Sequence, residues 1–418
     1  QVPFSDGKWN CYDAVFWQNF RPSERIQNLL AALAMLSPSN YLTNAFIART
    51  LIFINLYHRS YTMDFLLGMN QGLDLAFGCL MLERYMPFLN ARTTAEQTFG
   101  LDRGNYFTRT NIYPDGSSGE VSLNYALGTL GKLLEVYGIV NGTLPPQLPS
   151  DISEKLQSNV RYFARVIGPL GQAPRIAVPA ADYYSPTVQK YARLFNDTES
   201  LWIASLGDCE ECEGLPPFES VQFPWAGHIV FRSSWKPDAT YLFFEPGPRG
   251  TGHTDFSTLS VQLFANGEWL LTDPGVYSYE PGDQMQLYLF QTYAHCTAIV
   301  DGLSQCRPRV TAKVDPMIRL LNSVPGDYQF SDTEEAVFAS GTFNAGYGDN
   351  TNCFLTGVNH TRAIQFNKSS NSFIFWDTFT GVTSSSSPSS RRVTILWQLS
   401  PSAVTKAWFD PLNNIGVL

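Results

Sequence analysis

The sequence predicts an α+β protein in which a helical domain, residues 1–215, precedes an antiparallel β-sandwich, residues 216–418. Two observations predict this class. Apolar residues recur at helical spacing up to about residue 215, and beyond it they form short alternating runs broken by Gly, Pro and Asn. Helices and strands that are segregated along a chain indicate two domains. A chain of 418 residues is long enough for both.

The first part of the chain contains long segments with apolar residues three and four positions apart, which predicts helices. These segments are Ile26–Leu36, Leu42–His58, Phe65–Leu89, Val121–Tyr137 and Ile152–Ile167. The loops between them carry Pro, Gly and Asn. Successive helices of this length suit a toroid of paired helices.

The second part contains short runs with alternating apolar residues, which predicts strands of an antiparallel β-sandwich. Asn266-Gly267 between two such runs is a strong signal for a tight hairpin turn. The Pro-rich stretch Gly214–Pro224 is the expected junction between the domains. Examples of the predicted strands are His228–Arg232, Tyr241–Phe244, Ser257–Phe264, Trp269–Leu271, Ala298–Val300, Ala336–Ala339, Ser372–Trp376 and Arg392–Gln398.

Composition and charge exclude some classes of partner. The net charge is −9 and no basic run occurs, so we expect no nucleic-acid partner. No apolar stretch reaches the roughly 20 residues of a membrane span, so we expect no membrane insertion. Aromatic residues make up 14% and charged residues only 16%. This balance suits side chains that stack on sugar rings, and equally a well-filled sandwich core.

Several features favour a secreted, extracellular protein. Seven cysteines suit disulfides in an oxidising compartment, and the odd count leaves at least one thiol without a partner in the chain. Cys209 and Cys212 form a local bridge or bridge to cysteines elsewhere; Cys306 and Cys353 are further candidates, and the connectivity stays open. A Ser-rich loop covers residues 383–389. N-glycosylation triplets begin at Asn141, Asn196, Asn359 and Asn367.

Residues that carry chemistry gather between Arg249 and His295. The run Arg249-Gly-Thr-Gly-His253-Thr-Asp255 is followed by Leu-Thr-Asp273-Pro-Gly and by Tyr-Ala-His295. The chain has only five histidines, so two of them in this stretch stand out.

The order of these motifs, from Arg232-Ser-Ser-Trp235 to Gln305, resembles the C-terminal half of the heparinase II/III-like superfamily. Two matches in the helical part support the resemblance: Asp115-Gly with Glu120-Val-Ser-Leu-Asn-Tyr125, and the weaker Met69-Asn70-Gln71. The superfamily includes alginate and glycosaminoglycan lyases. The resemblance implies an N-terminal α/α toroid, which can be incomplete in this shorter chain, followed by an antiparallel β-sandwich.

The resemblance also implies a metal site. His253, Asp273 and His295 match the metal ligands of the superfamily, and Asp255 is expected to orient them. Two imidazoles and a carboxylate suit zinc best, with manganese or calcium as alternatives, and the metal can be structural rather than catalytic. The competing interpretation is that both histidines are ordinary hydrogen-bonded residues beside a turn.

By the same resemblance, the chain cleaves a uronic-acid polysaccharide by β-elimination. The site has to neutralise the uronate carboxylate, a task for Asn70 with Gln71 or Arg103. Tyr125 matches the catalytic tyrosine of the superfamily. Tyr279 is the first candidate from the sandwich, with Tyr277 and Tyr288 as alternatives. A tyrosine on an amphipathic helix or a strand can equally be a core residue.

Arg249 and Tyr277 are expected to bind the substrate, and Arg109 is a further cation to consider in the cleft. Three departures weaken the resemblance. Thr251 stands where many members carry a catalytic histidine, Gln71 replaces a usual histidine, and Cys296 replaces a usual asparagine. A uronyl C5-epimerase and a non-catalytic glycan-binding protein therefore remain alternatives to the lyase. In each case the expected partner is an acidic polysaccharide or oligosaccharide, and the oligomeric state is left open.

Overall fold

The computed structural model describes two compact units, residues 1–110 with 128–153, and residues 111–127 with 154–418. The predicted domain boundary at residue 215 stays a prediction. Within these units the structure describes residues 21–36, 42–63, 73, 77–78, 80–81, 99–141, 148–176, 183–210, 212, 216, 219–247, 255–276, 280, 282–306, 328–349, 352–381, 390–404, 408–410 and 415–417.

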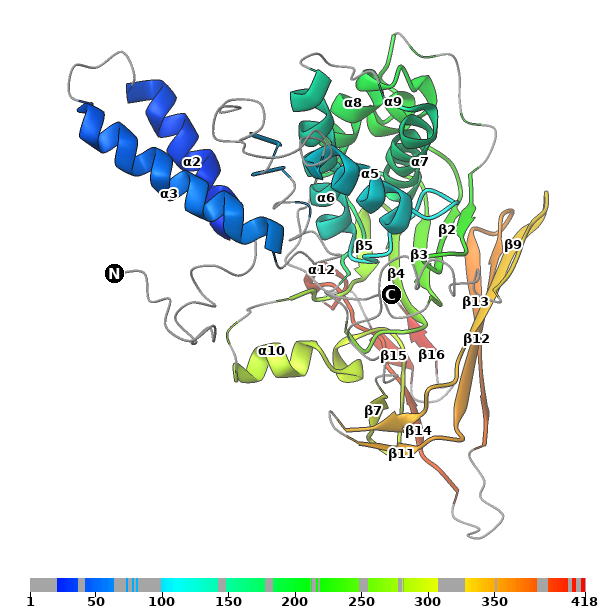
Figure 1. Ribbon diagram of the computed structural model, residues 1–418. Helices are drawn as coiled ribbons and strands as arrows, with labels where there is room; N and C mark the ends of the chain where they lie inside the picture. Colours follow the sequence, from blue (N-terminus) through cyan, green and yellow to red (C-terminus); the bar gives the residue numbers. More distant parts are fainter. Residues whose placement is uncertain are drawn as a thin grey trace. The chain divides into compact units, whose positions relative to one another are not determined.

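The first unit is helical. Helices α2 (Arg21–Leu36) and α3 (Asn44–Met63) pack together, as Figure 1 shows in blue. The unit also contains α5 (Phe99–Asn111), except its last residue, and most of α6 (Leu123–Asn141). These two helices are joined by Tyr137, whose hydroxyl lies 3.0 Å from Thr108 Oγ1 and donates to Asn105 Oδ1 at 3.0 Å. No helix among the described residues is long and apolar enough to span a membrane.

Most of the predicted helices are confirmed. Four of the five predicted segments coincide with α2, α3, α6 and α7 (Ser150–Val166), whereas Phe65–Leu89 falls largely outside the described residues. Among the described helices before residue 215, three have no counterpart in the prediction: α5, α8 (Ser185–Leu194) and α9 (Thr198–Ala204). The last two are short, so few turns were available to reveal a helical period.

The second unit contains two large antiparallel sheets. One has five strands in the order β1 to β5: Val221–Phe223, His228–Arg232, Tyr241–Glu245, Ser260–Ala265 and Glu268–Leu271. The other has the order β13-β12-β9-β8: Ser372–Thr380, Asn359–Asn367, Ala336–Phe343 and Gln329–Asp332. Every pair of neighbouring strands in them is antiparallel, which confirms the α+β class with antiparallel sheets.

Smaller elements complete the second unit. They are α10 (Gln284–Leu289), the 3₁₀ helix η2 (Thr292–Ala294), β6 (Ala298–Val300), β7 (Ser304–Gln305), β10 (Tyr347–Gly348), β11 (Cys353–Leu355), β14 (Val393–Ile395), α12 (Pro401–Val404), β15 (Trp408–Asp410) and β16 (Ile415–Val417). β6 pairs with β14, and β7 pairs with β10. The two strands that follow η2 are therefore each hydrogen-bonded to a later strand of the chain.

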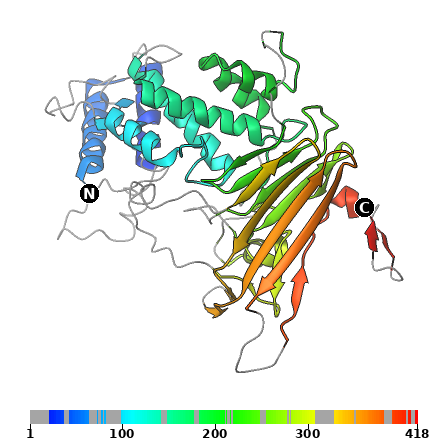
Figure 2. The ribbon, with the colours of Figure 1, turned by 90° about the vertical axis from the view of Figure 1, so that its right-hand side faces the viewer.

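The two large sheets share one core. Side chains from both sheets, among them Phe231, Phe244, Val337 and Ile364, form a single buried cluster. Figure 2 shows the orange strands of the second sheet in front of the green strands of the first. All five residues of β2 are buried, because helix α7 covers the other face of the five-stranded sheet, where Tyr241 donates to the carbonyl of Val166 at 2.7 Å.

The turn between β4 and β5 matches its prediction. Asn266 and Gly267 have φ angles of 54° and 82°, the left-handed pair that a two-residue hairpin turn requires. Ala265 and Glu268 are paired on either side of the turn. The turn fixes the register of β5, and β5 leads directly to Asp273.

Two disulfides are present among the described residues, as the cysteine count suggested. Cys209 is bonded to Cys212, which selects the local bridge among the alternatives, and Cys306 is bonded to Cys353. The second bridge links the residue after β7 to the first residue of β11. Cys296 is a buried free thiol.

Candidate functional site

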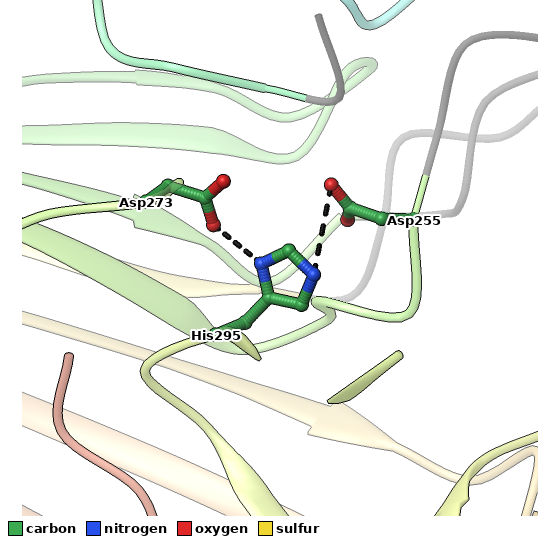
Figure 3. A group of neighbouring side chains, drawn as sticks. All are labelled: Asp255, Asp273 and His295. Carbon is green, nitrogen blue, oxygen red and sulfur yellow. Dashed lines mark hydrogen bonds and ion pairs between the residues drawn. The ribbon is translucent and has the colours of Figure 1, made fainter. Parts of the chain in front are cut away.

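His295 is the centre of a buried polar cluster. It follows η2 directly, and its imidazole is fully buried. Its Nδ1 lies 2.5 Å from Oδ2 of Asp273, and its Nε2 lies 3.8 Å from Oδ2 of Asp255 (Figure 3). Both carboxylates are buried as well, with 4% of Asp255 and 3% of Asp273 exposed. The two carboxylates therefore flank the two nitrogens of one imidazole.

Asp273 lies in the turn after β5, and the turn explains why the residue is an aspartate. Its Oδ1 accepts a hydrogen bond from the amide of Gly275 at 2.9 Å and closes the turn locally. Gly275 has a φ of 65°, a conformation that glycine adopts without steric cost. The second carboxylate oxygen is left to contact His295.

Asp255 lies in the segment that leads into β4, and this segment is tied to the one that carries His295. The amide of Thr258 donates to Gln305 Oε1 at 3.0 Å, and Gln305 Nε2 donates to the carbonyl of Thr258 at 2.7 Å. Thr297 Oγ1 donates to the same carbonyl at 2.8 Å. These bonds hold the two segments together and bring Asp255 to the imidazole.

The electrostatics of the cluster favour a positive charge. Burial opposes protonation of His295, but the carboxylates of Asp255 and Asp273 outweigh it and raise the pKa of His295 to about 9. Burial, reinforced by the same two carboxylates, holds the pKa of Glu245 well above its usual range. The two carboxylates on either side of the imidazole thus attract a cation, which is either the proton on His295 or a metal ion.

The cluster fits a divalent metal. One ligand atom from each of Asp255, Asp273 and His295 lies within 4.8 Å of the other two. His295 Nε2 is buried and has no hydrogen bond to any residue that the structure describes. Imidazole nitrogen with carboxylate oxygen is a donor set that zinc and manganese accept. These residues could hold the ion and leave a position for another ligand.

The structure brings together two of the three predicted ligands. Asp273 and His295 are in contact, whereas His253 lies outside the described residues. Asp255, which we expected only to orient the ligands, lies among the candidate donors. Glu245 was not predicted at all. The only signal for it in the sequence is a carboxylate that directly follows the apolar run Tyr-Leu-Phe-Phe.

Most of the other predicted site residues fall outside what the structure describes. Arg103 lies in α5, but its side chain is not described. Arg109 forms an ion pair with Asp151 at 2.7 Å, so its charge already has a counter-ion. Those outside the described residues are Asn70, Gln71, Arg249, Thr251, Tyr277 and Tyr279.

Tyr125 lies in the first turn of α6 and is half-buried. The loop before it is held by Asp115, whose Oδ1 accepts from the amide and hydroxyl of Ser117 at 3.0 and 2.6 Å. Its Oδ2 accepts from the amide of Trp225, between β1 and β2, at 2.9 Å. Asn159 of α7 donates to the carbonyl of Gly116 at 2.7 Å. The start of α6 is therefore anchored to the five-stranded sheet.

The fold and the site define an α+β protein with a candidate cation site. It combines a helical part, two antiparallel sheets around one core and a buried cluster of carboxylates and histidine. Residues 215–412 match the family described as "Heparinase II/III-like, C-terminal". This part of the chain belongs to the heparinase II/III-like superfamily, as the motifs predicted.

Two curated relatives are heparin-sulfate lyases. The one from Bacteroides stercoris is 23% identical over 286 residues, which cover 63% of this chain and 40% of that protein. The one from Pedobacter heparinus is 23% identical over 302 residues, which cover 69% of this chain and 45% of that protein. The chain thus matches less than half the length of these relatives.

Solved structures of heparinases have a similar fold. A mutant of heparan sulfate lyase HepC from Pedobacter heparinus has a TM-score of 0.69 at 19% identity over 97% of this chain and 59% of that chain. A structure of heparinase III has a TM-score of 0.74 at 16% identity over 98% of this chain and 60% of that chain. Identities this low establish likeness of fold alone.

Proposed function

We propose that the chain is a polysaccharide lyase, or the greater part of one, that cleaves a uronic-acid-containing glycosaminoglycan by β-elimination. The observation that carries this proposal is the buried Asp255–Asp273–His295 cluster within residues 215–412, the part of the chain that matches the family. The names of the two curated relatives support the substrate class.

The chemistry assigns separate tasks to the predicted residues. The proton on C5 of a uronate becomes acidic only when the neighbouring carboxylate is neutralised, and an amide or guanidinium can do this. We assign that task to Asn70, with Gln71 and Arg103 in support. A base then removes the C5 proton, and an acid protonates the oxygen that leaves C4. Tyr125 is our candidate for this proton transfer.

The sheet part of the chain supplies the remaining groups in this proposal. Tyr279 is the second candidate for proton transfer, while Arg249 and Tyr277 hold the acidic polymer. Thr251 stands where a catalytic histidine is common in the superfamily, so the proton transfers depend on tyrosine here. An arginine near the polymer pairs with its carboxylate or sulfate groups through two parallel hydrogen bonds.

The proposed metal site consists of Asp273 and His295, two of the three predicted ligands, together with Asp255 from the same cluster. His253, the third predicted ligand, is part of the proposal. Zinc is our first choice, with manganese and calcium as alternatives. When bound, the ion would supply positive charge that offsets the buried carboxylates.

We further propose that the helices form part of an α/α toroid and that the two sheets form a β-sandwich, the arrangement expected of the superfamily. The two disulfides support secretion, because such bonds persist in oxidising compartments. The glycosylation triplets at Asn141, Asn196, Asn359 and Asn367 fit the same proposal. The side chain of Asn196 is exposed and therefore accessible to modification.

The test is a set of uronic-acid polymers incubated with the purified chain and followed by near-ultraviolet absorbance. Glycosaminoglycans are expected to give the absorbance of a new C4–C5 double bond, and alginate and glucuronan serve as comparison substrates. Tyr125→Phe and Asn70→Ala are expected to lose turnover by at least about 100-fold. The control is Tyr183→Phe, which changes a tyrosine that is 62% exposed.

The outcomes separate the alternatives. Exchange of the C5 proton with solvent, with no gain in absorbance, would indicate a uronyl C5-epimerase. Binding without exchange or absorbance would indicate a glycan-binding protein. Either result, obtained with every polymer across acid and alkaline pH, would overturn the lyase proposal.

A further inference from the structure

Arg362 is buried in the middle of β12, on the sheet that lacks the candidate ligands. Its side chain is fully buried, which is rare for arginine without a counter-ion. The counter-ion is Asp377, directly opposite on β13. Nε and Nη2 donate to its two carboxylate oxygens at 2.8 and 3.1 Å. This fork-like pairing fixes the plane of the guanidinium.

The third nitrogen of the guanidinium contacts two segments outside the sheet that contains β12. Nη1 donates to the carbonyl of Leu259 at 2.9 Å and to the carbonyl of Cys296 at 2.6 Å. Leu259 lies on the segment that carries Asp255, and Cys296 directly follows His295. One nitrogen thus holds the backbone of both segments that form the candidate metal site.

The two segments need such a connection. Leu259 has a φ of 69°, a left-handed conformation that costs a branched residue roughly 1 to 2 kcal/mol and persists only when the surroundings hold it. The amide of Leu259 donates to the carbonyl of Glu245 at 2.8 Å, and its carbonyl accepts from Arg362. Cys296 has a second hydrogen bond to the segment around Leu259, because its amide donates to Ser260 Oγ at 3.2 Å.

The orientation of Asp377 is itself fixed. His360 Nε2 lies 2.6 Å from Oδ1 of Asp377, and the imidazole of His360 stacks on Phe379 with ring centroids 4.3 Å apart. The guanidinium of Arg362 lies 5.2 Å from the ring of Trp397. The guanidinium of Arg362 therefore contacts Asp377, the ring of Trp397 and two backbone carbonyls, and it cannot rotate without breaking several of these contacts.

We infer that Arg362 is a positioning residue, which sets the distance between Asp255 and His295 and thereby the affinity of the site for a divalent cation. This inference rests on the metal site of the proposed function. Without Arg362, Leu259 relaxes from its left-handed conformation, and the carbonyls of Leu259 and Cys296 lose a shared donor. The two ligand-bearing segments then separate, although no ligand has been changed.

The test compares two buried arginines in the full chain. Arg362→Met removes the donor described above, and Arg232→Met serves as the matched control. Arg232 is also buried and donates from Nη2 to the carbonyl of Ile167 at 2.6 Å, at the end of α7. Its guanidinium lies 4.2 Å from the ring of Trp235. Zinc affinity of the metal-free protein is measured by competition with a chromogenic chelator, and folding by thermal unfolding.

We expect Arg362→Met to raise the Kd for zinc by about 10- to 100-fold, as is typical when groups that orient metal ligands are removed. Arg232→Met is expected to lower the unfolding temperature and to change the Kd by less than about threefold. Arg362→Lys, which keeps one donor and the charge, is expected to restore part of the affinity. Equal zinc affinity in wild type, Arg362→Met and Arg232→Met would overturn the inference.

A second variant covers the case in which Arg362→Met does not fold. Asp377→Asn leaves Arg362 in place but removes the charge that aligns it, and we expect a rise in the Kd of roughly tenfold or less. Unchanged affinity in both Asp377→Asn and Arg362→Lys would then overturn the inference. If the wild-type chain itself binds no zinc, manganese or calcium, the proposed metal site fails and the inference with it. Metal binding by the wild type thus tests the proposed site, and the difference in Kd between wild type and the variants tests the role of Arg362.

Discussion

At the scale of single residues, His295 owes its properties to where the backbone places two carboxylates. Both Asp255 and Asp273 are nearly inaccessible to solvent, so their charges act on the imidazole with little screening. A metal ion that binds there relieves repulsion among buried acidic groups as well as forming bonds. Its removal should therefore weaken the fold and not only the activity.

We expect a chelator to lower the unfolding temperature of the zinc-loaded wild type by about 5 °C, which corresponds to zinc present at about 100 times its Kd. His295→Ala should unfold at the same temperature with and without the chelator, because it lacks the imidazole ligand. Differential scanning calorimetry measures both. Asp332→Asn, which changes a partly exposed carboxylate paired with Lys368, should retain the chelator effect.

His228 provides a test of pH dependence away from the proposed metal site. It is fully buried in β2, its Nδ1 lies 2.7 Å from the hydroxyl of Tyr162, and burial lowers its pKa from 6.5 to about 3. Between these two pH values the unfolded chain binds a proton at this residue and the folded chain does not. Stability therefore falls as pH falls through this window.

The wild type is expected to lose about 2 kcal/mol through His228 between pH 7 and pH 5. His228→Gln removes this contribution, so its deficit relative to wild type should shrink by about that amount at pH 5. Tyr162→Phe removes the hydroxyl but keeps the buried imidazole, so its deficit should stay nearly constant. Urea unfolding at the two pH values measures these differences, and identical pH dependence in wild type and His228→Gln would refute the assignment.

At the scale of elements, the loop from Tyr113 to Glu120 shows how a short motif is fixed. Gly116 has a φ of 85°, and a β-carbon there would lie 2.2 Å from the carbonyl oxygen of Ser158 in α7. The glycine is thus required by close approach as well as by backbone conformation. The same loop leads into the first turn of α6, where Tyr125 lies.

Gly116→Ala should lower the free energy of unfolding by at least about 2 kcal/mol, since it combines a left-handed conformation with a steric clash. Gly128→Ala is the matched control, because its β-carbon would meet no atom within 4 Å in the interior of α6. That change should raise the free energy of unfolding by about 0.5 to 1 kcal/mol. Chemical denaturation distinguishes the two; equal effects would show that the clash is relieved by a shift of α7.

The elements that sequence patterns predicted are those whose signals are local. The Asn266-Gly267 turn was predicted because two residues alone determine its conformation. Strand β12 was not among the predicted strands, although it is an inner strand of its sheet, because His360 and Arg362 occupy two of its four buried positions and interrupt the apolar alternation. A buried arginine cannot be told from an exposed one until its partner on a neighbouring strand is known.

The same reasoning applies to the site. Asp273 and His295 were predicted to share a site through the resemblance to the superfamily, whereas Glu245 and Arg362 depend on contacts between segments far apart in the chain. Asp255 is among the candidate donors because hydrogen bonds around Thr258 hold its segment against the one that carries His295. Such pairings carry no signal in the spacing of residues along the sequence.

At the scale of the whole molecule, the disulfides have unequal effects on the unfolded chain. Cys306 and Cys353 are 47 residues apart, whereas Cys209 and Cys212 are three residues apart. A bridge that closes a longer loop removes more freedom from the unfolded ensemble. The bridge between Cys306 and Cys353 should therefore contribute most of the stabilisation that the two provide.

Replacing Cys306 and Cys353 together by serine should lower the free energy of unfolding by about 2 to 5 kcal/mol. The corresponding double replacement of Cys209 and Cys212 should lower it by about half that amount or less, because its loop is so short. Equilibrium unfolding of both variants under non-reducing conditions measures the difference. A larger loss from the short bridge would contradict this order.

The buried thiol of Cys296 directly follows His295, and burial raises its pKa to about 12. At neutral pH almost none of it is the reactive thiolate, and its sulfur accepts a hydrogen bond from the amide of Gln398 at 3.1 Å. An alkylating reagent reaches this sulfur only when the chain around it opens. The modification rate of Cys296, followed by peptide mass, therefore reports how often the backbone beside His295 opens. No cysteine has to be introduced for this measurement.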